Sequence, residues 1–179
     1  QMVNYDSHRN MFEAWNSKLW NNTSGLLLWM THPAWPSMIW QVYSWDFETF
    51  GSYFASQKAC EPIHVQMNLN DSQVVVVNTS LRSLQNALVT LEVFDLKGKS
   101  IFTQKTNLNV LSNQLNKVFK ANLPAELPDN YLVRLILKDK NGAVISHNDY
   151  WKNVKKTGNF LAFNDLESTK LAIKVTGSK

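Results

Sequence analysis

Apolar and polar residues alternate with a period of two from Ile63 onwards, and this alternation predicts strands. In the first stretch, Ile63, Val65 and Met67 share one face. Seven further runs carry strand signals, and Asn-Gly and Lys-Gly turn signals separate some of them. They are residues 73–78, 87–95, 99–106, 114–121, 130–138, 143–151 and 170–176. Seven or eight strands in about 115 residues predict an immunoglobulin-like β-sandwich without a disulfide.

The residues before Pro62 follow another pattern. Apolar residues in 7–20 recur at spacings of one, three and four, which predicts a helix with a broad apolar face, and Asp6 or Ser7 is expected to cap its start. Residues 26–30 (LLLWM) form a short apolar run, typical of a strand buried on both faces. Prolines 33 and 36 predict a loop after it, and a second helix is expected from Asp46 to the stop at Pro62. Together these elements make one α–β–α passage of an α/β fold.

Six of the seven tryptophans lie between Trp15 and Trp45. One strand with two helices cannot bury so many large rings, and each exposed Trp or Phe forfeits roughly 1.5–3 kcal/mol of burial free energy. Either these rings pack on the sandwich, or they belong to a barrel or sheet whose earlier strands are missing from this chain.

Composition and charge exclude several classes of protein. A hydrophobic content of 44% with 18% charged residues is that of a folded chain, and no apolar run approaches the roughly 20 residues that cross a bilayer, so we expect no membrane partner. The net charge is +4, with fifteen basic and nine acidic residues in 67–179. These lysines are scattered, and Lys155-Lys156 is the only adjacent pair, so we expect a solvated surface and no nucleic-acid partner.

Metal, cofactor and thiol chemistry find little support in the sequence. The four histidines, at positions 8, 32, 64 and 147, have no ligand spacing among themselves or with Cys60, so no metal site is expected. No Gly-rich phosphate loop or Gly-x-Ser-x-Gly elbow occurs, and no cofactor is expected. Cys60 is expected to be a buried, inert thiol. For His32 we expect an exposed or hydrogen-bonding role.

Two stretches, MFEAWN and GLLLWMTHPAWPSMIWQVYSWDFETFGSYFASQKACEP, resemble the end of the catalytic (β/α)8 barrel of glycoside hydrolase family 2. The resemblance covers about residues 5–66 and points to the exo-β-glucosaminidase and β-mannosidase-like branches. In that family an immunoglobulin-like sandwich follows the barrel, in agreement with the alternation after Pro62. The expected fold is therefore mainly β, with residues 1–62 as the incomplete end of a TIM barrel and residues 63–179 as the sandwich domain.

The resemblance implies a retaining hydrolase with two catalytic glutamates, a nucleophile and an acid/base, held about 5–5.5 Å apart. In the family they lie on barrel strands four and seven, upstream of the matched segment. No catalytic residue is therefore expected among the carboxylates of the N-terminal part, which are Asp6, Glu13, Asp46, Glu48 and Glu61.

Two tryptophans are the candidate substrate-binding residues. The resemblance places Trp29 at the C-terminal end of a barrel strand, where its indole can stack on a sugar ring, with an ordinary barrel-core role as the alternative. Trp35 follows in the same loop and can line the cleft or pack behind it. Ser44 and His32-Pro33 depart from the family pattern and leave the sugar preference open among glucosaminide, mannoside and galactoside.

Three hypotheses of function follow. In the first, the chain is the inactive C-terminal part of an exo-β-glycosidase, whose partners are the upstream part of the same enzyme and a glycan, and whose parent is periplasmic or secreted. In the second, the sandwich is a carbohydrate-binding or interaction module. This needs a planar row of exposed aromatics, for which the candidates are Tyr150, Trp151, Phe160 and Phe163, although adjacent strand residues face opposite ways. In the third, the chain is a cleavage product that stays bound to the upstream fragment. An isolated chain is expected to self-associate through its aromatic-rich N-terminal segment.

Overall fold

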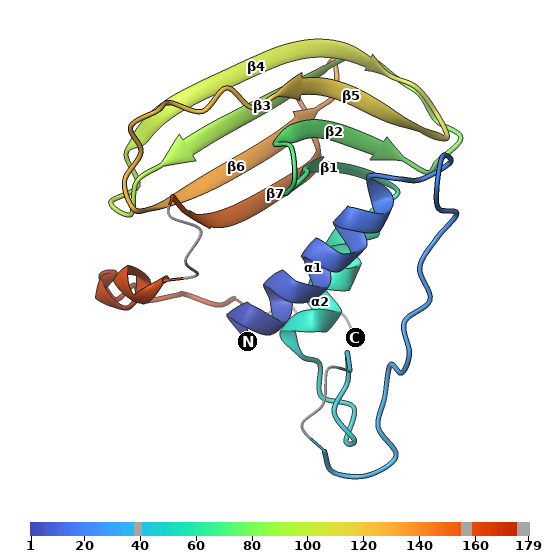
Figure 1. Ribbon diagram of the computed structural model, residues 1–179, viewed down its shortest axis with the longest axis vertical. Coiled ribbons are helices and arrows are strands. Elements are labelled where there is room, and N and C mark those ends of the chain that lie inside the picture. Colours follow the sequence, from blue (N-terminus) through green and yellow to red (C-terminus); the bar gives the residue numbers. More distant parts are fainter. Residues whose placement is uncertain (38–40, 155–158, 175–179) are drawn as a thin grey trace.

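The computed structural model describes residues 1–37, 41–154 and 159–174. Over these residues the chain is mainly β, with two α-helices ahead of seven strands and one short 3-10 helix behind them (Figure 1). The helices are α1 (Met2–Asn16), α2 (Gly51–Ala59) and η1 (Leu161–Asp165). The strands are β1 (Ile63–Met67), β2 (Gln73–Asn78), β3 (Leu84–Phe94), β4 (Ser100–Val110), β5 (Gln114–Lys120), β6 (Asn130–Lys138) and β7 (Val144–Asn153).

The strands form two antiparallel sheets that face each other. One sheet has the order β1-β2-β5 and the other β4-β3-β6-β7. The core lies between them, because alternate residues of each strand point inward. Val65 and Val76 from the first sheet and Leu91, Val133 and Leu135 from the second are fully buried. Burying a Val or Leu side chain contributes about 1.5–3 kcal/mol, so these residues account for much of the stability of the sandwich.

Helices α1 and α2 lie side by side against β1 and β7 (Figure 1). Their close approach depends on Gly51, since a Cβ atom there would lie 2.7 Å from the backbone oxygen of Gln1. The amide of Gly51 donates to Gln1 Oε1 at 2.7 Å, and that of Ser52 donates to Asn4 Oδ1 at 2.6 Å. The connecting segment between the helices (residues 17–37 and 41–50) extends away from the sandwich (Figure 1).

The sequence predicted the strands more closely than the helices. Strands form at seven of the eight predicted places, within a few residues at each end. The eighth, at 170–176, is wrong for residues 170–174, which form no strand, and residues 175–176 lie outside the described residues. Helix α1 begins before the predicted 7–20 and ends sooner, so that Asp6 and Ser7 lie inside it instead of capping it. Helix α2 begins at Gly51 instead of near Asp46.

The strand predicted at residues 26–30 is not formed. Leu27 is 97% exposed and Trp29 is 80% exposed. The physical reason is that a strand buried on both faces needs a neighbouring strand on each edge, and the described residues bring none to this segment. The run therefore forms no regular element, and Leu27 and Trp29 stay uncovered.

Cys60 is exposed, so the prediction of a buried thiol is wrong. It follows the last residue of α2, where the helix ends and Ala59 takes the covered position. Partial desolvation still raises the pKa of the Cys60 thiol above its ordinary value.

No described helix is long and apolar enough to cross a membrane. Within the described residues, no group of three or more His, Cys, Asp and Glu side chains is arranged to hold a metal ion.

Candidate functional site

The two predicted substrate-binding tryptophans lie on the connecting segment, away from the sandwich. Trp29 is 80% exposed and Trp35 is 66% exposed. Neither contributes to the pocket between the helices and β7 described below. The structure therefore leaves both rings accessible but brings neither of them to a carboxylate pair.

Local contacts stabilise the conformation at the end of the connecting segment. Tyr43 and Thr49 are bridged, and the ring of His32 stacks on Phe47 with 4.4 Å between ring centroids. His32 Nε2 also lies 3.1 Å from the backbone oxygen of Trp45, in keeping with the hydrogen-bonding role expected of it. These contacts fix the turn that follows the two candidate tryptophans.

Two acidic residues lie in that same turn, at Asp46 and Glu48. Ser44 Oγ donates a hydrogen bond to Asp46 Oδ1, and this bond lowers the pKa of the Asp46 carboxyl. Both residues are exposed, and Glu48 contributes its backbone oxygen to the turn by accepting from the Ser44 amide at 2.9 Å. The geometry gives them a local structural role.

A buried polar cluster joins α1 to the sandwich, and we call it the junction network. It consists of Arg9, Glu13, Glu61, His64, Asn148 and Tyr150. Glu13 of α1 is only 3% exposed. Its carboxylate accepts from His64 Nε2 at 3.0 Å, from Asn148 Nδ2 at 2.6 Å and from Tyr150 Oη at 3.0 Å. One carboxylate thus ties the helix to both β1 and β7.

His64 is fully buried and lies between two carboxylates. Besides Glu13, its Nδ1 atom is 3.3 Å from Glu61 Oε2. Although burial opposes the charged form, hydrogen bonds to Glu13 and Glu61 raise the pKa of His64 above its ordinary value. Burial likewise opposes the Glu61 carboxylate, but hydrogen bonds from His64, Lys58 and Ser146 lower the pKa of Glu61 to about 2. Glu61 is therefore ionised near neutral pH, and the two carboxylates favour the charged form of His64.

Arg9, also a member of the junction network, packs against the ring of Tyr150. Its guanidinium is 1% exposed and lies 4.3 Å from the centroid of the Tyr150 ring, within cation–π range. It donates to Asp6 Oδ1 at 2.5 Å and to the backbone oxygen of Asp149. Burial and the nearby Glu13 carboxylate together raise the pKa of Tyr150 well above its ordinary value. The tyrosine therefore stays neutral and donates its proton to Glu13.

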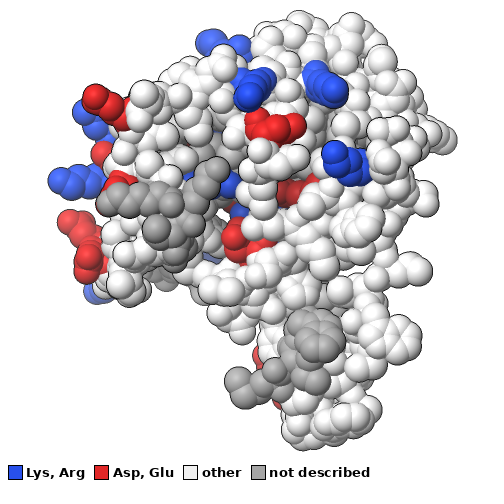
Figure 2. Space-filling view, in the orientation of Figure 1, with Lys and Arg blue, Asp and Glu red and all other residues white. Residues whose placement is uncertain are grey.

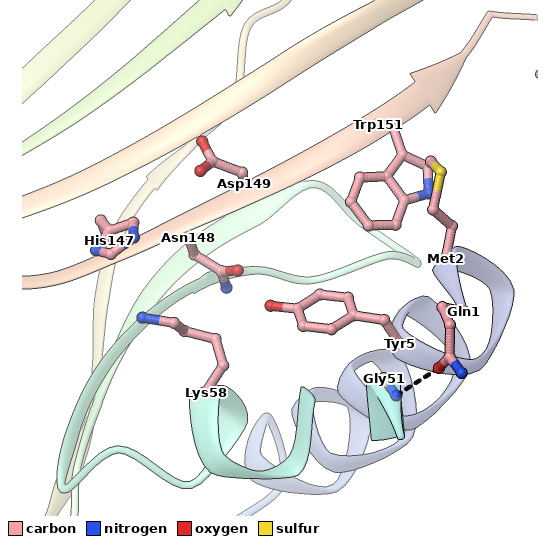
Figure 3. Close-up of a pocket in the computed structure, with 9 residues that line it drawn as sticks. All are labelled: Gln1, Met2, Tyr5, Gly51, Lys58, His147, Asn148, Asp149 and Trp151. Atoms are coloured by element: carbon pink, nitrogen blue, oxygen red, sulfur yellow. Dashed lines mark hydrogen bonds between the residues drawn. The ribbon is translucent and has the colours of Figure 1, made fainter. Parts of the chain in front are cut away.

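A pocket of about 420 Å³ opens beside this network, between the helices and β7 (Figure 3). Tyr5 and Lys58 reach into it from the helices, while Asn148 and Trp151 face them from β7 (Figure 3). The full lining is Gln1, Met2, Tyr5, Gly51, Lys58, His147, Asn148, Asp149 and Trp151. Asp149 is its one carboxylate, and it is bound to Arg134 Nε at 2.7 Å. The described residues that line this pocket therefore do not supply the pair of carboxyl groups that most glycoside hydrolases place across the bond.

Sequence reasoning missed the junction network. A signal for it was present: Asp6, Arg9 and Glu13 follow one another at helical spacing, and β7 alternates Ser146, Asn148 and Tyr150 on one face. Neither row was predicted to join the helix to the sandwich. They are buried because each covers the other, a pairing between residues more than 130 positions apart in the chain.

The aromatic row that a binding module needs is not formed by its candidates. Tyr150 is 1% exposed and belongs to the junction network. Trp151 is only partly exposed and lies beside Tyr5, with 5.9 Å between ring centroids. Phe160 and Phe163 pack edge to face on each other at 5.9 Å, with 67° between their planes. No planar platform results from these four rings.

Comparison with known proteins identifies the sandwich. Residues 70–156 match a family model described as a mannosidase Ig/CBM-like domain. The exo-β-D-glucosaminidase of Hypocrea virens is 33% identical over 155 residues, which are 84% of this chain and 17% of that protein. The mannosylglycoprotein endo-β-mannosidase of Lilium longiflorum is 30% identical over 162 residues, 88% of this chain and 17% of that protein. The chain thus spans about a sixth of the length of these relatives.

Solved structures give the same result. The exo-chitosanase of Amycolatopsis orientalis superimposes with a TM-score of 0.77 at 26% identity, over 86% of this chain and 19% of that one. The β-D-mannosidase of Dictyoglomus thermophilum superimposes with a TM-score of 0.72 over 83% of this chain and 18% of that one, and at 18% identity it shows the fold alone. The chain fits the C-terminal segment of a glycoside hydrolase family 2 enzyme, in the branch that contains exo-β-glucosaminidases and β-mannosidases.

Proposed function

We propose that this chain is part of a retaining exo-β-glycosidase that removes terminal β-linked glucosamine, and that both catalytic glutamates lie upstream of it. The observation that carries the proposal is the 33% identity with an exo-β-D-glucosaminidase over 84% of the chain. Similar proteins from Amycolatopsis orientalis and Streptomyces avermitilis bear the same name. The lily enzyme makes β-mannoside the competing substrate class, and β-galactoside is the third.

The proposal includes residues 1–62 as the last part of a (β/α)8 barrel. The alignment with the Amycolatopsis enzyme covers 161 residues, which is too long to fit within residues 63–179, so it extends into the N-terminal part. The run at 26–30, which forms no strand and leaves Leu27 and Trp29 exposed, is what we expect of a barrel strand that lacks its neighbours. In the whole enzyme, this run would pair with strands supplied by the upstream part.

The exposed apolar surface of the N-terminal part supports the same partner. Figure 2 shows little charge over the lower projection, which Figure 1 identifies as the connecting segment. Its exposed large apolar side chains are Trp20, Leu27, Trp29, Met30, Trp35, Trp45 and Phe47. Apolar surface of this extent marks an interface, and the upstream part of the same enzyme is the partner we propose for it. In an isolated chain the same surface would favour self-association.

The carboxylates of this chain support an upstream location for the catalytic pair. A retaining hydrolase holds its two carboxyl groups across a cleft that a sugar can enter. Glu13 is 3% exposed, and Glu61 accepts from Lys58 Nζ at 2.6 Å. Asp46 and Glu48 are exposed but lie together in one turn. The contribution that we propose for this chain is a wall of the sugar subsite, with Trp29 stacking on the pyranose and Trp35 lining the cleft.

The test is complementation. The chain is produced with and without the upstream part of the same enzyme, and hydrolysis of aryl β-glucosaminide, β-mannoside and β-galactoside is measured. We expect activity only for the complex, and we expect the aryl β-glucosaminide to be hydrolysed faster than the other two substrates. Within the complex, Trp29→Ala is expected to raise KM or lower kcat, whereas Leu81→Ala, at an exposed apolar residue outside the connecting segment, leaves both unchanged. A complex that forms but hydrolyses none of the three substrates would contradict the proposal.

A further inference from the structure

The His64 ring makes hydrogen bonds through both of its nitrogens, and both partners are carboxylates. Glu13 Oε1 lies 3.0 Å from Nε2 and Glu61 Oε2 lies 3.3 Å from Nδ1. A neutral imidazole has one N–H and can donate to only one of them, whereas the imidazolium donates to both. Since the ring is fully buried, water does not supply the missing donor. With both carboxylates ionised, the geometry calls for the charged ring.

Asn148 does not change this assignment. Its Nδ2 atom lies 3.3 Å from His64 Nε2, a contact that would call for a lone pair on the ring. The same atom is 2.6 Å from Glu13 Oε1 and 2.9 Å from Tyr150 Oη. The backbone oxygen of Val65 also lies 3.1 Å from this nitrogen. An amide nitrogen carries two hydrogens, and these three shorter contacts compete for both of them. A lone pair on His64 Nε2 is therefore not needed to satisfy the Asn148 amide.

The charges around His64 balance only when it is protonated. The charged and titratable groups that surround it come from α1 (Asp6, Arg9 and Glu13), from α2 and the residue after its cap (Lys58 and Glu61) and from β7 (Tyr150). Arg9 pairs with Asp6 at 2.5 Å and Lys58 pairs with Glu61 at 2.6 Å. If His64 loses its proton, the Glu13 carboxylate keeps two hydrogen-bond donors among the described residues. These are Asn148 and Tyr150, and both are neutral. A buried carboxylate without a cation is strongly destabilising.

We propose that His64 is a pH-sensitive clasp, in which the imidazolium holds α1 and the end of α2 on the sandwich, and its deprotonation loosens both helices from β1 and β7. The clasp goes beyond the proposed function because it needs no substrate. If the N-terminal part is the end of a barrel, the clasp joins barrel to sandwich.

The direction of the pH dependence follows from the shift of His64. Its pKa in the folded state is raised above the ordinary 6.5 by the two carboxylates, against the opposing effect of burial. The stabilisation that it contributes is complete below the ordinary value and is lost as the pH rises through the folded-state value. The clasp is therefore closed below the ordinary pKa of histidine and opens as the pH rises through the folded-state pKa of His64.

Two measurements on the chain test the clasp without any substrate. One is an NMR titration of the His64 ring, resolved from His8, His32 and His147. The other is amide exchange of α1, corrected for intrinsic rates, over about pH 5 to pH 9. We expect His64 to titrate above its ordinary pKa, and the protection of α1 to fall with the same midpoint.

Matched variants separate the clasp from general effects of pH. His64→Gln is expected to remove the pH dependence of α1 protection, whereas His147→Gln, an exposed histidine on β7, is expected to keep it. If His64→Gln does not fold, the titration of the unmodified chain decides. A His64 that titrates at or below its ordinary pKa, or α1 protection that stays constant through the His64 titration, would overturn the proposal. Neither result depends on whether the parent enzyme is a glycosidase.

Discussion

The hydroxyl of Tyr150 donates a 3.0 Å hydrogen bond to Glu13 Oε2 and so connects the last strand of the sandwich to helix α1. The same hydroxyl accepts from the amide of Met67 at 2.9 Å, which adds β1 to the connection. Three elements thus meet at one oxygen atom. The junction between the helices and the sandwich is therefore polar and specific instead of a general apolar contact.

Tyr150→Phe is expected to lower the free energy of unfolding by roughly 1.5–3 kcal/mol, because it removes a hydrogen bond to a charged group and leaves a buried amide unpaired. Urea denaturation measures the change. Tyr131→Phe is the control, since Tyr131 is 7% exposed and its hydroxyl makes no hydrogen bond within the described part of the chain. Equal losses from the two variants would contradict the role given to Tyr150.

His64→Gln is expected to destabilise the chain by roughly 3–5 kcal/mol at pH 6, because it leaves the buried Glu13 carboxylate without its cation. Glu13→Gln is expected to cost less, because His64 keeps Glu61 as a partner. The double variant removes both charges and is expected to cost less than the sum of the two. A double-mutant cycle in urea gives the interaction energy, which should exceed roughly 0.5 kcal/mol. Additive losses would show that the two side chains do not act as a pair.

Stability is expected to fall in acid through Glu61. Its folded-state pKa of about 2 lies below the ordinary 4.5, so its stabilisation is complete above the ordinary value and is lost as the pH falls towards the folded-state value. Urea unfolding measured from about pH 6 down to about pH 2 follows this loss. Glu61→Gln should flatten the acid limb, and Glu126→Gln, at an exposed position, should leave it unchanged. If the free energy of unfolding of Glu61→Gln falls as steeply in acid as that of the unmodified chain, the loss of stability comes from other groups.

Gly51→Ala is expected to destabilise the helix pair, although alanine favours helices by about 1 kcal/mol over glycine. The added Cβ would lie 2.7 Å from the Gln1 carbonyl oxygen and 3.2 Å from the Tyr5 nitrogen, both backbone atoms. Relieving this contact costs typically 1–3 kcal/mol. Thermal unfolding monitors the change. Gly25→Ala, where no atom lies within 4 Å of the new Cβ, is the control and should be neutral.

The strands could be predicted from the sequence because the alternation that marks them is local. In β3, Ala87, Val89, Leu91 and Val93 show it within seven residues, and all four are buried. The run at 26–30 was misassigned because an apolar run reports that burial is needed, not where the covering strands come from. The partner that we propose for this burial is the upstream part of the same enzyme.

The junction network could not be predicted from the sequence for a related reason. Glu13 and Tyr150 are 137 positions apart, and each is unremarkable within its own element. A glutamate on a helix and polar residues on a strand usually face water. Their burial follows only from the docking of α1 on β1 and β7, which no local pattern encodes.

The most direct test of the central claim is turnover by the purified chain alone. The chain, shown by mass to be intact and free of other polypeptides, is assayed against aryl β-glucosaminide, β-mannoside and β-galactoside. Because the catalytic glutamates are proposed to lie upstream, we predict no hydrolysis of any of the three until the upstream part is added. Hydrolysis by the chain alone that persists after repurification would contradict this claim and would place a catalytic carboxylate pair within these 179 residues.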